Sequence, residues 1–366
     1  MRAGLISIEI SHKTAPLPLR ERITMDADAL PDCLRRLRDI CDECVILKTC
    51  GRLELYAVTS DAPDAWLDRY ALLTGIPLKA LKPFAHRRQG TAAAVHLMRV
   101  AAGLESPLLG EDHILGQVRD AFMRATDANV VGPILSALFR SAIHGGKRVR
   151  HETPISRVAR SYADRAADLL EHSSSPIENV LILGAGSLAR DVASRLATGG
   201  RRRIHIVSRH LRRAASLAAE NGCEAHPFED LPALLDETDA IVACTSSPRY
   251  IIEAPVLDGH GRPLTIVDLG MPRNVDPDVA LHADVSLRAL DDFADRDRVH
   301  DKIIRAARSI IEQEMDRFLK WTRARQAAPI IARLRSLADG LDPESARRMK
   351  RAVHQTIQRL HEGTAA

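Results

Sequence analysis

The sequence predicts a multidomain protein that joins an α+β domain, an α/β domain and a helical C-terminal domain. Three observations lead to this fold class. An apolar run breaks at Cys50 and resumes with period 2, which indicates a pair of strands. A glycine-rich turn at 184–189 lies between an apolar strand and a helix, as in doubly wound α/β units. The C-terminal part is charged and has helical periodicity. The expected domains are 1–155, 156–290 and 291–366.

Composition and cysteine usage narrow the class of protein. The 366 residues suffice for two or three domains, and the net charge of +4 permits a polyanionic partner without requiring one. No apolar run is long enough to span a membrane, and the first ten residues have no signal-peptide layout. We therefore expect a cytoplasmic protein with reduced thiols. Cys41 and Cys44 form a C-x-x-C pair, but no second pair follows nearby, so no metal site is expected.

The first 75 residues predict a small α+β sandwich. Residues 4–10 alternate as a strand. Asp26 is a suitable cap for a helix that runs to about residue 40 and places Leu30, Leu34 and Leu37 on one face. The two strands around Cys50 follow, and then a helix near 64–73. Strand, helix, strand, strand, helix is the opening of such a sandwich.

The break between the two strands is a candidate reactive segment. Cys50 falls at a loop or strand end, where a thiol can meet a ligand. Gly51 lets other backbone approach closely, and Arg52 supplies a positive charge that favours the thiolate and can bind a carboxylate. The alternative interpretation of the same residues is a buried cysteine beside a solvated Arg52–Glu54 pair.

From 89 to 150 the pattern is helical. A turn between Gly103 and Gly110 joins two helices, and the polar groups beside it are candidates for lining a pocket: Ser106, Glu111, His113 and Gln117. His96 lies on the first of these helices, where a histidine is either catalytic or simply structural. The basic run 145–151 is a solvated face by default, with a nucleic-acid contact as the alternative.

Residues 178–269 carry the pattern of a dinucleotide-binding unit. The strand 180–183 leads into the G-x-G-x-x-A turn Gly184-Ala185-Gly186-Ser187-Leu188-Ala189, and a helix follows. The second strand ends in Ser208-Arg209, without the acid that would bind the ribose 2′-hydroxyl of NAD. Serine and arginine suit the 2′-phosphate of NADP instead, so the expected cofactor is NADPH.

The C-terminal part predicts a dimerisation module. Ile304, Ile311, Met315 and Phe318 form a narrow apolar stripe, the pattern of a long helix that pairs with another helix. Pro329 is expected to interrupt this helix, and later helices to continue the stripe.

Taken together, the dispersed motifs resemble the glutamyl-tRNA reductase family over nearly the whole chain. They are Ser11-His12-Lys13-Thr14-Ala15-Pro16, Thr49-Cys50-Gly51-Arg52-Leu53-Glu54, His96-Leu97, Gly103-Leu104-Glu105-Ser106, Gly110-Glu111, Ile114-Leu115-Gly116-Gln117, Gly145-x-Lys147-Arg148-Val149-Arg150, Gly184-Ala185-Gly186 and Pro272-Arg273. The resemblance implies a V-shaped dimer, with catalytic and NADPH domains arranged along a long spinal helix.

The resemblance also implies a reaction. The Cys50 thiolate would attack the ester of glutamyl-tRNA to give an enzyme thioester. Hydride from NADPH would then release glutamate-1-semialdehyde, with His96 assisting proton transfer. By the same resemblance Arg52 would bind the glutamyl carboxylate, and the other substrate residues are Thr49, Gly51, Ser106, Glu111, Asp112, His113 and Gln117. Gly184 to Ala189, with Ser208 and Arg209, would hold NADPH, and a glutamate-1-semialdehyde aminomutase is a candidate partner.

The chain departs from the family pattern at four places: Gly51 replaces Asn, His113 replaces Gln, Ser161-Tyr162-Ala163-Asp164 replaces a small-residue helix start, and Gly270-Met271 replaces Ala-Val. These departures concern aminoacyl specificity more than reaction type. The remaining alternatives are a reductase of another aminoacyl-tRNA or acyl thioester, a shikimate-type dehydrogenase, and a non-catalytic tRNA-binding relative. Cys50 disfavours the dehydrogenase, and the retained site residues disfavour the non-catalytic relative.

Overall fold

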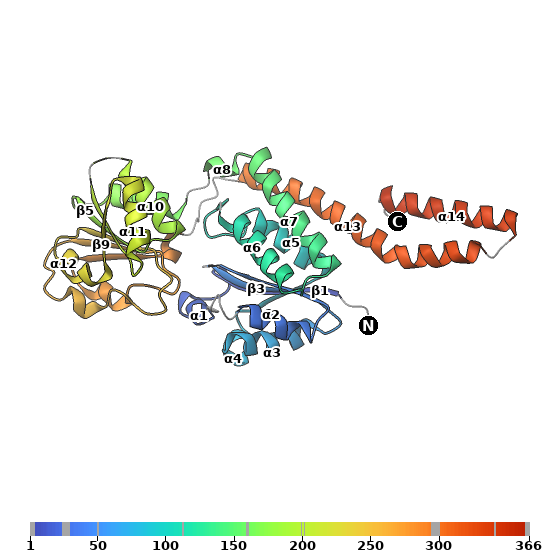
Figure 1. The fold of residues 1–366 in the computed structure, drawn as a ribbon, viewed down its shortest axis with the longest axis horizontal. Helices are drawn as coiled ribbons and strands as arrows, with labels where there is room; N and C mark the ends of the chain where they lie inside the picture. Colours follow the sequence, from blue (N-terminus) through green and yellow to red (C-terminus); the bar gives the residue numbers. More distant parts are fainter. Residues whose placement is uncertain are drawn as a thin grey trace.

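Three bodies follow one another along the molecule (Figure 1). The nucleotide-binding sheet lies at one end, the N-terminal domain in the middle, and a pair of long helices projects from the other end. Cys50, Asp112 and the expected cap Asp26 lie outside the residues that can be described. The computed structural model describes residues 4–23, 30–49, 51–111, 113–158, 161–198, 200, 202–293, 301–339 and 342–362.

The N-terminal domain is built on a four-stranded antiparallel sheet in the order β2-β3-β1-β4. Its strands are β1 (Gly4–Ser11), β2 (Glu43–Lys48), β3 (Arg52–Thr59) and β4 (His86–Gln89). Every residue of β3 is buried, because helices cover both faces of the sheet. The expected sandwich is therefore present, and the strands at 4–10 and around residue 50 are confirmed.

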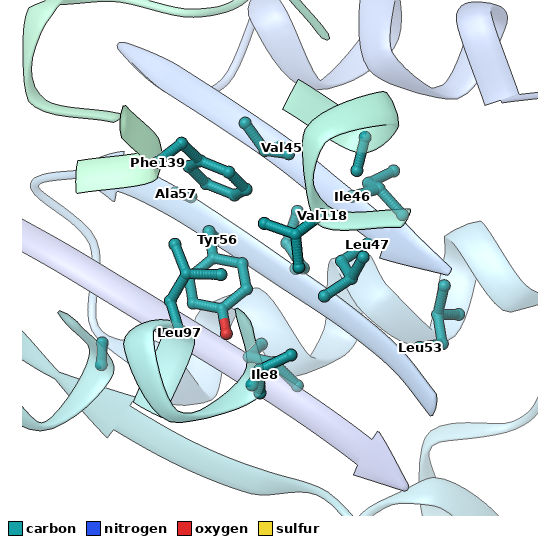
Figure 2. Packing of buried hydrophobic residues seen from close by; sticks show 14 of the residues in the cluster. Ile8, Val45, Ile46, Leu47, Leu53, Tyr56, Ala57, Leu97, Val118 and Phe139 are labelled. Carbon is teal, nitrogen blue, oxygen red and sulfur yellow. The ribbon is translucent and has the colours of Figure 1, made fainter. Parts of the chain in front are cut away.

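Helices on the two faces differ in their role. One face carries α1 (Leu17–Arg22), α2 (Leu30–Arg38), α3 (Pro63–Thr74) and α4 (Leu78–Leu81). The other carries α5 (Gly90–Ala101), α6 (His113–Asp127) and α7 (Pro133–Glu152), and the short α8 (Ile155–Val158) follows. Figure 2 shows the second face, where Val45 and Tyr56 of the sheet meet Val118 of α6 and Phe139 of α7. The Tyr56 and Phe139 rings pack edge-on, with centroids 5.7 Å apart.

Glycines at two places allow backbones to approach closely within this domain. Gly103 has a φ of +77°, and a Cβ there would lie 2.9 Å from the Cα of Gly110, so the turn after α5 closes on itself. On α7, a Cβ at Gly146 would lie 2.6 Å from the carbonyl oxygen of Ala101. Glycine at these positions is what seats α7 against α5 and closes the 103–110 turn.

The second domain is a six-stranded, all-parallel sheet in the order β10-β9-β8-β5-β6-β7. The order reverses direction beside β5, and ligands bind at such a switch point in open α/β sheets. The strands are β5 (Asn179–Leu183), β6 (Arg203–Val207), β7 (Glu224–His226), β8 (Ala240–Ala243), β9 (Leu264–Asp268) and β10 (Val285–Ala289). The α-helices are α9 (Tyr162–Glu171), α10 (Ser187–Ala197), α11 (Leu211–Asn221) and α12 (Leu231–Leu235), and the 3-10 helices are η1 (Phe228–Asp230), η2 (Ala254–Leu257), η3 (Pro277–Leu281) and η4 (Leu290–Phe293).

The C-terminal part is a helical hairpin of α13 (Asp301–Ala338) and α14 (Pro343–Glu362), as Figure 1 shows. The expectation that Pro329 interrupts the helix was wrong, because α13 continues through it. Pro329 is exposed, so water can satisfy the carbonyl group that loses its N–H partner.

The apolar stripe also has a different partner from the one expected. Ile311, Met315 and Phe318 are buried in the core of the N-terminal domain, where α13 packs on α5 and α7 of the same chain. Gly145 of α7 permits this approach, because a Cβ there would lie only 3.1 Å from the Glu314 side chain. The first half of α13 thus anchors the helix to its own chain, and the large apolar residues of α13 that are exposed lie in its second half.

The basic run on α7 has structural partners within the chain. Arg148 binds the carboxylates of Glu152 and Glu314, at 2.7 and 2.8 Å. Arg150 donates to the carbonyl oxygens of Ala101 and Glu111, both at 2.9 Å. These two arginines fix α13 and the 103–111 segment, so neither is the free nucleic-acid contact considered above. Among the described residues, no helix is both long and apolar enough to cross a bilayer.

Candidate active site

The turn between β2 and β3 is pinned on both sides of residue 50. The Thr49 amide donates to the Arg52 carbonyl at 2.9 Å, and the Gly51 amide donates to the Thr49 hydroxyl at 3.1 Å. The His12 amide donates to the Gly51 carbonyl at 2.9 Å. Cys50 itself lies outside the described residues, but its two sequence neighbours are held by these bonds. The backbone on either side of residue 50 is therefore held by hydrogen bonds within the same domain.

Position 51 can accept a side chain. A Cβ built on Gly51 would lie 3.6 Å from the Pro107 ring and 3.8 Å from Nδ1 of His12, which are ordinary contact distances. The glycine thus leaves room between the turn and the 103–110 loop.

Behind the turn, buried charges form a connected network. Nη1 of Arg52 donates to Glu54 at 2.8 Å, and Nη2 donates to the Glu105 carbonyl. The Tyr56 hydroxyl donates to the other Glu54 oxygen at 2.5 Å. Burial opposes the charge of Glu54, but His96 and Arg52 hold the pKa of this carboxyl well below its usual range. The Arg52–Glu54 pair is therefore charged and buried, so the solvated pair considered from sequence is wrong.

His96 is oriented by two carboxylates. Its Nε2 lies 3.2 Å from Glu54 and 3.4 Å from Glu9, and all three side chains are buried. An Nε2–H donated to Glu54 leaves Nδ1 as the ring atom available to a reacting group. The two carboxylates fix the plane of the ring, and a proton-transfer residue needs such a fixed orientation.

The 103–110 loop is tied to the same turn. Glu105 accepts from Lys13 and from Arg99, both at 2.5 Å. Burial opposes the negative charge of Glu105, but the bond from Lys13 keeps the pKa of its carboxyl below the usual value. Because Glu105 contacts Arg52 and Pro107 faces Gly51, Ser106 lies between two residues that meet the turn. Ser106 is thus brought to the predicted site with Thr49, Gly51 and Arg52.

Glu111 and His113 line a different cavity. It has a volume of about 470 Å³ and lies between the start of α6 and helices α9 and α10. His113 Nε2 lies 3.1 Å from Asp191 of α10, so this histidine faces the nucleotide-binding domain. Gln117 follows one turn later on α6. The structure therefore separates the predicted substrate residues into two groups, and the roles of this second group stay predictions.

A narrow cavity beside the turn contains residues that sequence reasoning missed. Thr49 and Arg52 share it with Arg20 and Lys48 of the same domain and with Met271 of the nucleotide-binding domain. The full lining is Arg20, Ile23, Lys48, Thr49, Arg52, Leu53 and Met271. In the sequence Arg20 belongs to a short mixed segment with no motif, so no spacing connects it to residue 49.

The nucleotide cavity contains most of the predicted cofactor residues. Its lining is Leu183, Gly184, Ala185, Gly186, Val207, Ser208, Arg209, His210, Arg213, Phe228, Cys244, Thr245, Ser246 and Ile251. Gly184, with a φ of +115°, admits no Cβ, because one would lie 2.8 Å from the Cys244 carbonyl oxygen. A Cβ at Gly186 would meet open space, the space that a phosphate of a dinucleotide uses at this turn. The cavity therefore fits the dinucleotide that the motif predicts.

Three predicted cofactor residues lie outside this cavity. Ser187 starts α10, Leu188 lines the cavity beside His113, and Ala189 is buried against the sheet. Ala189, which stands at the third glycine position of the motif, thus allows α10 to pack closely on the strand. Arg213, in the first turn of α11, was missed by the sequence analysis. It lines the cavity together with Arg209, so two arginines lie beyond the end of β6.

Two ion pairs connect the domains through α1. Nη2 of Arg20 lies 2.5 Å from Asp291, and Arg273 binds Glu21 at 2.7 Å. The loop that carries Arg273 is held by Asp268, which accepts from the amides of Gly270, Asn274 and Val275. Burial nevertheless raises the pKa of Asp268 to about 6. This loop places Met271 at the narrow cavity beside Thr49.

Four of the other thiols lie in surroundings that disfavour the thiolate. The hydrogen bond with Cys41 and burial raise the pKa of Cys44 far above its usual value, and burial does the same for Cys244. Burial also raises the pKa values of Cys33 and Cys223. A thiol with a raised pKa is a poor nucleophile at neutral pH.

The fold and the cavities define a class of protein: an NAD(P)-binding oxidoreductase with a separate α+β domain and a helical dimerisation domain. Residues 8–153 match the Glutamyl-tRNAGlu reductase N-terminal domain, 166–295 match Shikimate / quinate 5-dehydrogenase, and 306–364 match the Glutamyl-tRNAGlu reductase dimerisation domain. The chain belongs to the glutamyl-tRNA reductase family.

Individual relatives resemble the chain over most of its length. Glutamyl-tRNA reductase of Alkalilimnicola ehrlichii is 35% identical over 91% of this chain and 78% of the relative. That of Myxococcus xanthus is 37% identical over 92% and 79%. The solved structure of glutamyl-tRNA reductase from Methanopyrus kandleri is 29% identical, covers 98% of this chain and 94% of its own, and superposes with a TM-score of 0.52.

Proposed function

We propose that this chain reduces the ester of glutamyl-tRNA to glutamate-1-semialdehyde, the first step of the five-carbon route to tetrapyrroles. The observation that carries the proposal is the pinned turn around residue 50, with the carboxylate-held His96 behind it and Met271 of the nucleotide-binding domain beside it. Family membership supplies the substrate class.

Cys50 is the proposed nucleophile. Its thiolate attacks the ester carbonyl, a carbon–sulfur bond forms, and the bond to the tRNA ribose oxygen breaks. His96 donates the proton that this leaving oxygen needs, from Nδ1 while Glu54 holds Nε2. Four of the other cysteines, Cys33, Cys44, Cys223 and Cys244, have raised thiol pKa values. Cys41 is followed by an acidic residue, Asp42, whereas Cys50 is followed two residues later by Arg52, whose positive charge favours a thiolate.

A Cys50→Ser replacement tests this mechanism. Serine lacks a thiolate, so we expect aldehyde formation from charged glutamyl-tRNA to fall on the order of 10³-fold or more. In the absence of nucleotide, the parent protein should release tRNA and retain an acid-stable glutamyl group. Cys33→Ser is the matched control, because this half-buried thiol lies on α2, and it should retain activity. Full activity in Cys50→Ser would contradict the thioester mechanism.

NADPH is the proposed cofactor, and when bound it supplies the hydride that reduces the thioester. Gly184 to Gly186 would approach the pyrophosphate, and Arg209 with Arg213 would bind the 2′-phosphate. No acidic side chain lines this cavity among the described residues, so nothing there favours a free 2′-hydroxyl.

The cofactor choice can be measured by comparing NADPH with NADH. Arg209→Ala removes a cation that only the 2′-phosphate would meet, so KM for NADPH should rise about ten- to a hundredfold and KM for NADH should change little. Arg202→Ala is the control, because Arg202 precedes β6 and does not line the nucleotide cavity. It should leave KM for NADPH and KM for NADH near those of the parent. Equal losses with both nucleotides in Arg209→Ala would show that Arg209 does not bind the 2′-phosphate.

The remaining assignments follow from this reaction. The proposed units are a catalytic domain over 1–155, a nucleotide-binding domain over 156–290 and a dimerisation domain over 291–366. The substrate is a charged tRNA, which places the reaction in the cytoplasm. The product aldehyde would pass to a glutamate-1-semialdehyde aminomutase. Glu111, Asp112, His113 and Gln117 are retained as proposed substrate residues.

A further inference from the structure

A group of potential metal ligands lies at the edge of the nucleotide-binding sheet, apart from the residues of the proposed reaction. His205 is on β6, and Glu224 and His226 are on the neighbouring edge strand β7. In the parallel register His205 pairs with Glu224, and Val207 pairs with His226. Residues two apart on a strand point to the same face, so these three side chains share one face of the sheet.

The ligand atoms of this group converge on one point. Nδ1 of His205 lies 3.0 Å from Nε2 of His226, and the Glu224 carboxylate lies 3.8 Å from the first nitrogen and 3.9 Å from the second. Two nitrogens bound to one tetrahedral zinc ion at about 2.0–2.1 Å are about 3.3 Å apart, so the two rings already have nearly the required separation. The Glu224 side chain is 66% exposed and is free to move the remaining distance.

The surroundings of the two rings suit a bound cation. Nε2 of His226 can be a ligand only when the ring proton is on Nδ1, and that atom faces the Asp230 carboxylate at 4.0 Å. A carboxylate behind a ligating imidazole is a common arrangement around protein-bound zinc. The carboxylates of Glu224 and Glu237 also act on His205, partly offset by the positive charge of Arg203.

We propose that His205, Glu224 and His226 bind a divalent transition-metal ion, with Zn²⁺ as the best match. Zinc accepts two imidazoles and one carboxylate, whereas Ca²⁺ and Mg²⁺ prefer oxygen ligands. Because Glu224 is exposed, water can complete the coordination. No metal site was expected from the sequence, because His205 and the Glu224-x-His226 pair meet only when β7 adds to β6. The proposal is independent of the proposed reaction.

The proposed site is next to one wall of the nucleotide cavity. Val207, which pairs with His226, lines that cavity, and so does Phe228, two residues after His226. His205, Glu224 and His226 themselves are not lining residues. A bound ion would therefore hold the three-residue edge strand β7 on β6 without contacting the nucleotide. This is a structural role, separate from hydride transfer.

The test offers Zn²⁺ to the reduced full-length protein and counts the bound ions by equilibrium dialysis. His205→Ala and His226→Ala should each bind one ion fewer per chain than the parent. Glu224→Gln changes an exposed side chain, so it should keep the fold and weaken zinc binding at this site at least about tenfold. The matched controls are His172→Ala, at an exposed histidine after α9, and Glu229→Gln, at an exposed carboxylate of η1. Both should bind as many ions as the parent.

Co²⁺ distinguishes this site from the cysteines. Cobalt held by imidazole and carboxylate absorbs in the visible range without the near-ultraviolet charge-transfer band of a thiolate ligand. The parent should develop the visible bands with Co²⁺, and His205→Ala and His226→Ala should lose them. The His172→Ala control should have the spectrum of the parent.

Each outcome supports or overturns the site. The loss of one ion in both histidine variants, with full binding in both controls, supports it. A parent protein that binds no Zn²⁺, unchanged binding in His205→Ala or His226→Ala, or a cobalt spectrum with thiolate bands alone would overturn it. If a histidine variant does not fold, Glu224→Gln decides: weaker zinc binding supports the proposal, and unchanged binding overturns it.

Discussion

At the scale of single residues, burial fixes protonation states around the thiol segment, and His12 is the clearest case. Its backbone amide donates a hydrogen bond to the Gly51 carbonyl. Its side-chain Nδ1 is buried and has no hydrogen-bond partner among the described residues. Burial, reinforced by the positive charges of Arg52 and Lys13, lowers the pKa of His12 to about 3. His12 is therefore neutral in the folded protein near neutral pH.

This predicts a specific pH dependence of stability. In the unfolded chain His12 takes up a proton below a pKa of about 6.5, whereas in the folded protein it stays neutral. The contribution of this pKa difference to the free energy of unfolding is therefore complete above about pH 6.5. It is lost as the pH falls from 6.5 toward 3. Between pH 7 and pH 5 the free energy of unfolding should drop by about 1–2 kcal/mol more in the parent than in His12→Asn. Urea unfolding followed by the fluorescence of the buried Trp66 measures this, and parallel pH profiles would contradict it.

At the scale of elements, α7 begins without a cap of its own, and a distant side chain supplies one. Gly132 precedes the helix and has no side chain to accept from it. Glu43, at the start of β2, accepts from the amides of Ile134 and Leu135 at 2.9 and 2.6 Å. A carboxylate at a helix N-terminus also meets the positive end of the helix dipole. One side chain thus joins the sheet to the helix that supports α13.

Replacing Glu43 by Gln should therefore destabilise the N-terminal domain. The carboxamide can accept one of the two amide protons, but its own NH₂ would face the other. We expect a loss of about 1–3 kcal/mol in the free energy of unfolding, measured by urea titration. Asp64→Asn, in the first turn of α3, is the matched control; its carboxylate is 80% exposed, and the change should stay within about 0.5 kcal/mol. Equal effects of both replacements would exclude the capping role of Glu43.

At the scale of the whole molecule, the two halves of α13 have different surroundings. Its first half packs on the N-terminal domain of the same chain, and its second half does not. Met315 and Phe318 are buried there, whereas Ile330 is 58% exposed and Leu337 is 56% exposed. Together with the match of 306–364 to a dimerisation domain, this exposure identifies the second half of α13 as the surface available to a partner copy.

The dimer should therefore depend on the second half of α13. Ile330→Asp with Leu337→Asp places charges in an apolar interface, so the parent dimer should become a monomer by light scattering at micromolar concentration. Leu72→Asp, on α3 and 83% exposed, is the control and should leave the assembly unchanged. A doubly substituted protein that stays dimeric would place the interface elsewhere. Truncation before α13 is a poorer test, because it would uncover the core around α5 and α7.

Local pattern determined much of this protein from sequence alone. Periodicity and turn chemistry are local, so the strands beside residue 50, the Gly184–Gly186 turn and the helical tail were all predictable. The family followed from motifs in order. The same reasoning placed Thr49, Gly51, Arg52 and Ser106 at one site, and the structure brings them together.

Only the tertiary structure decided which groups face one another across long separations. Arg20 meets Asp291, and Glu43 meets the start of α7, because strands and helices far apart in the chain are packed together. The apolar stripe of α13 could not reveal whether its partner was another copy or its own domain, since a hydrophobic face has the same pattern in both cases. The burial of the Arg52–Glu54 pair also could not be predicted locally: the sequence allowed a solvated pair, and the structure shows a buried, charged one. These outcomes depend on desolvation and distance, which only the packed molecule sets.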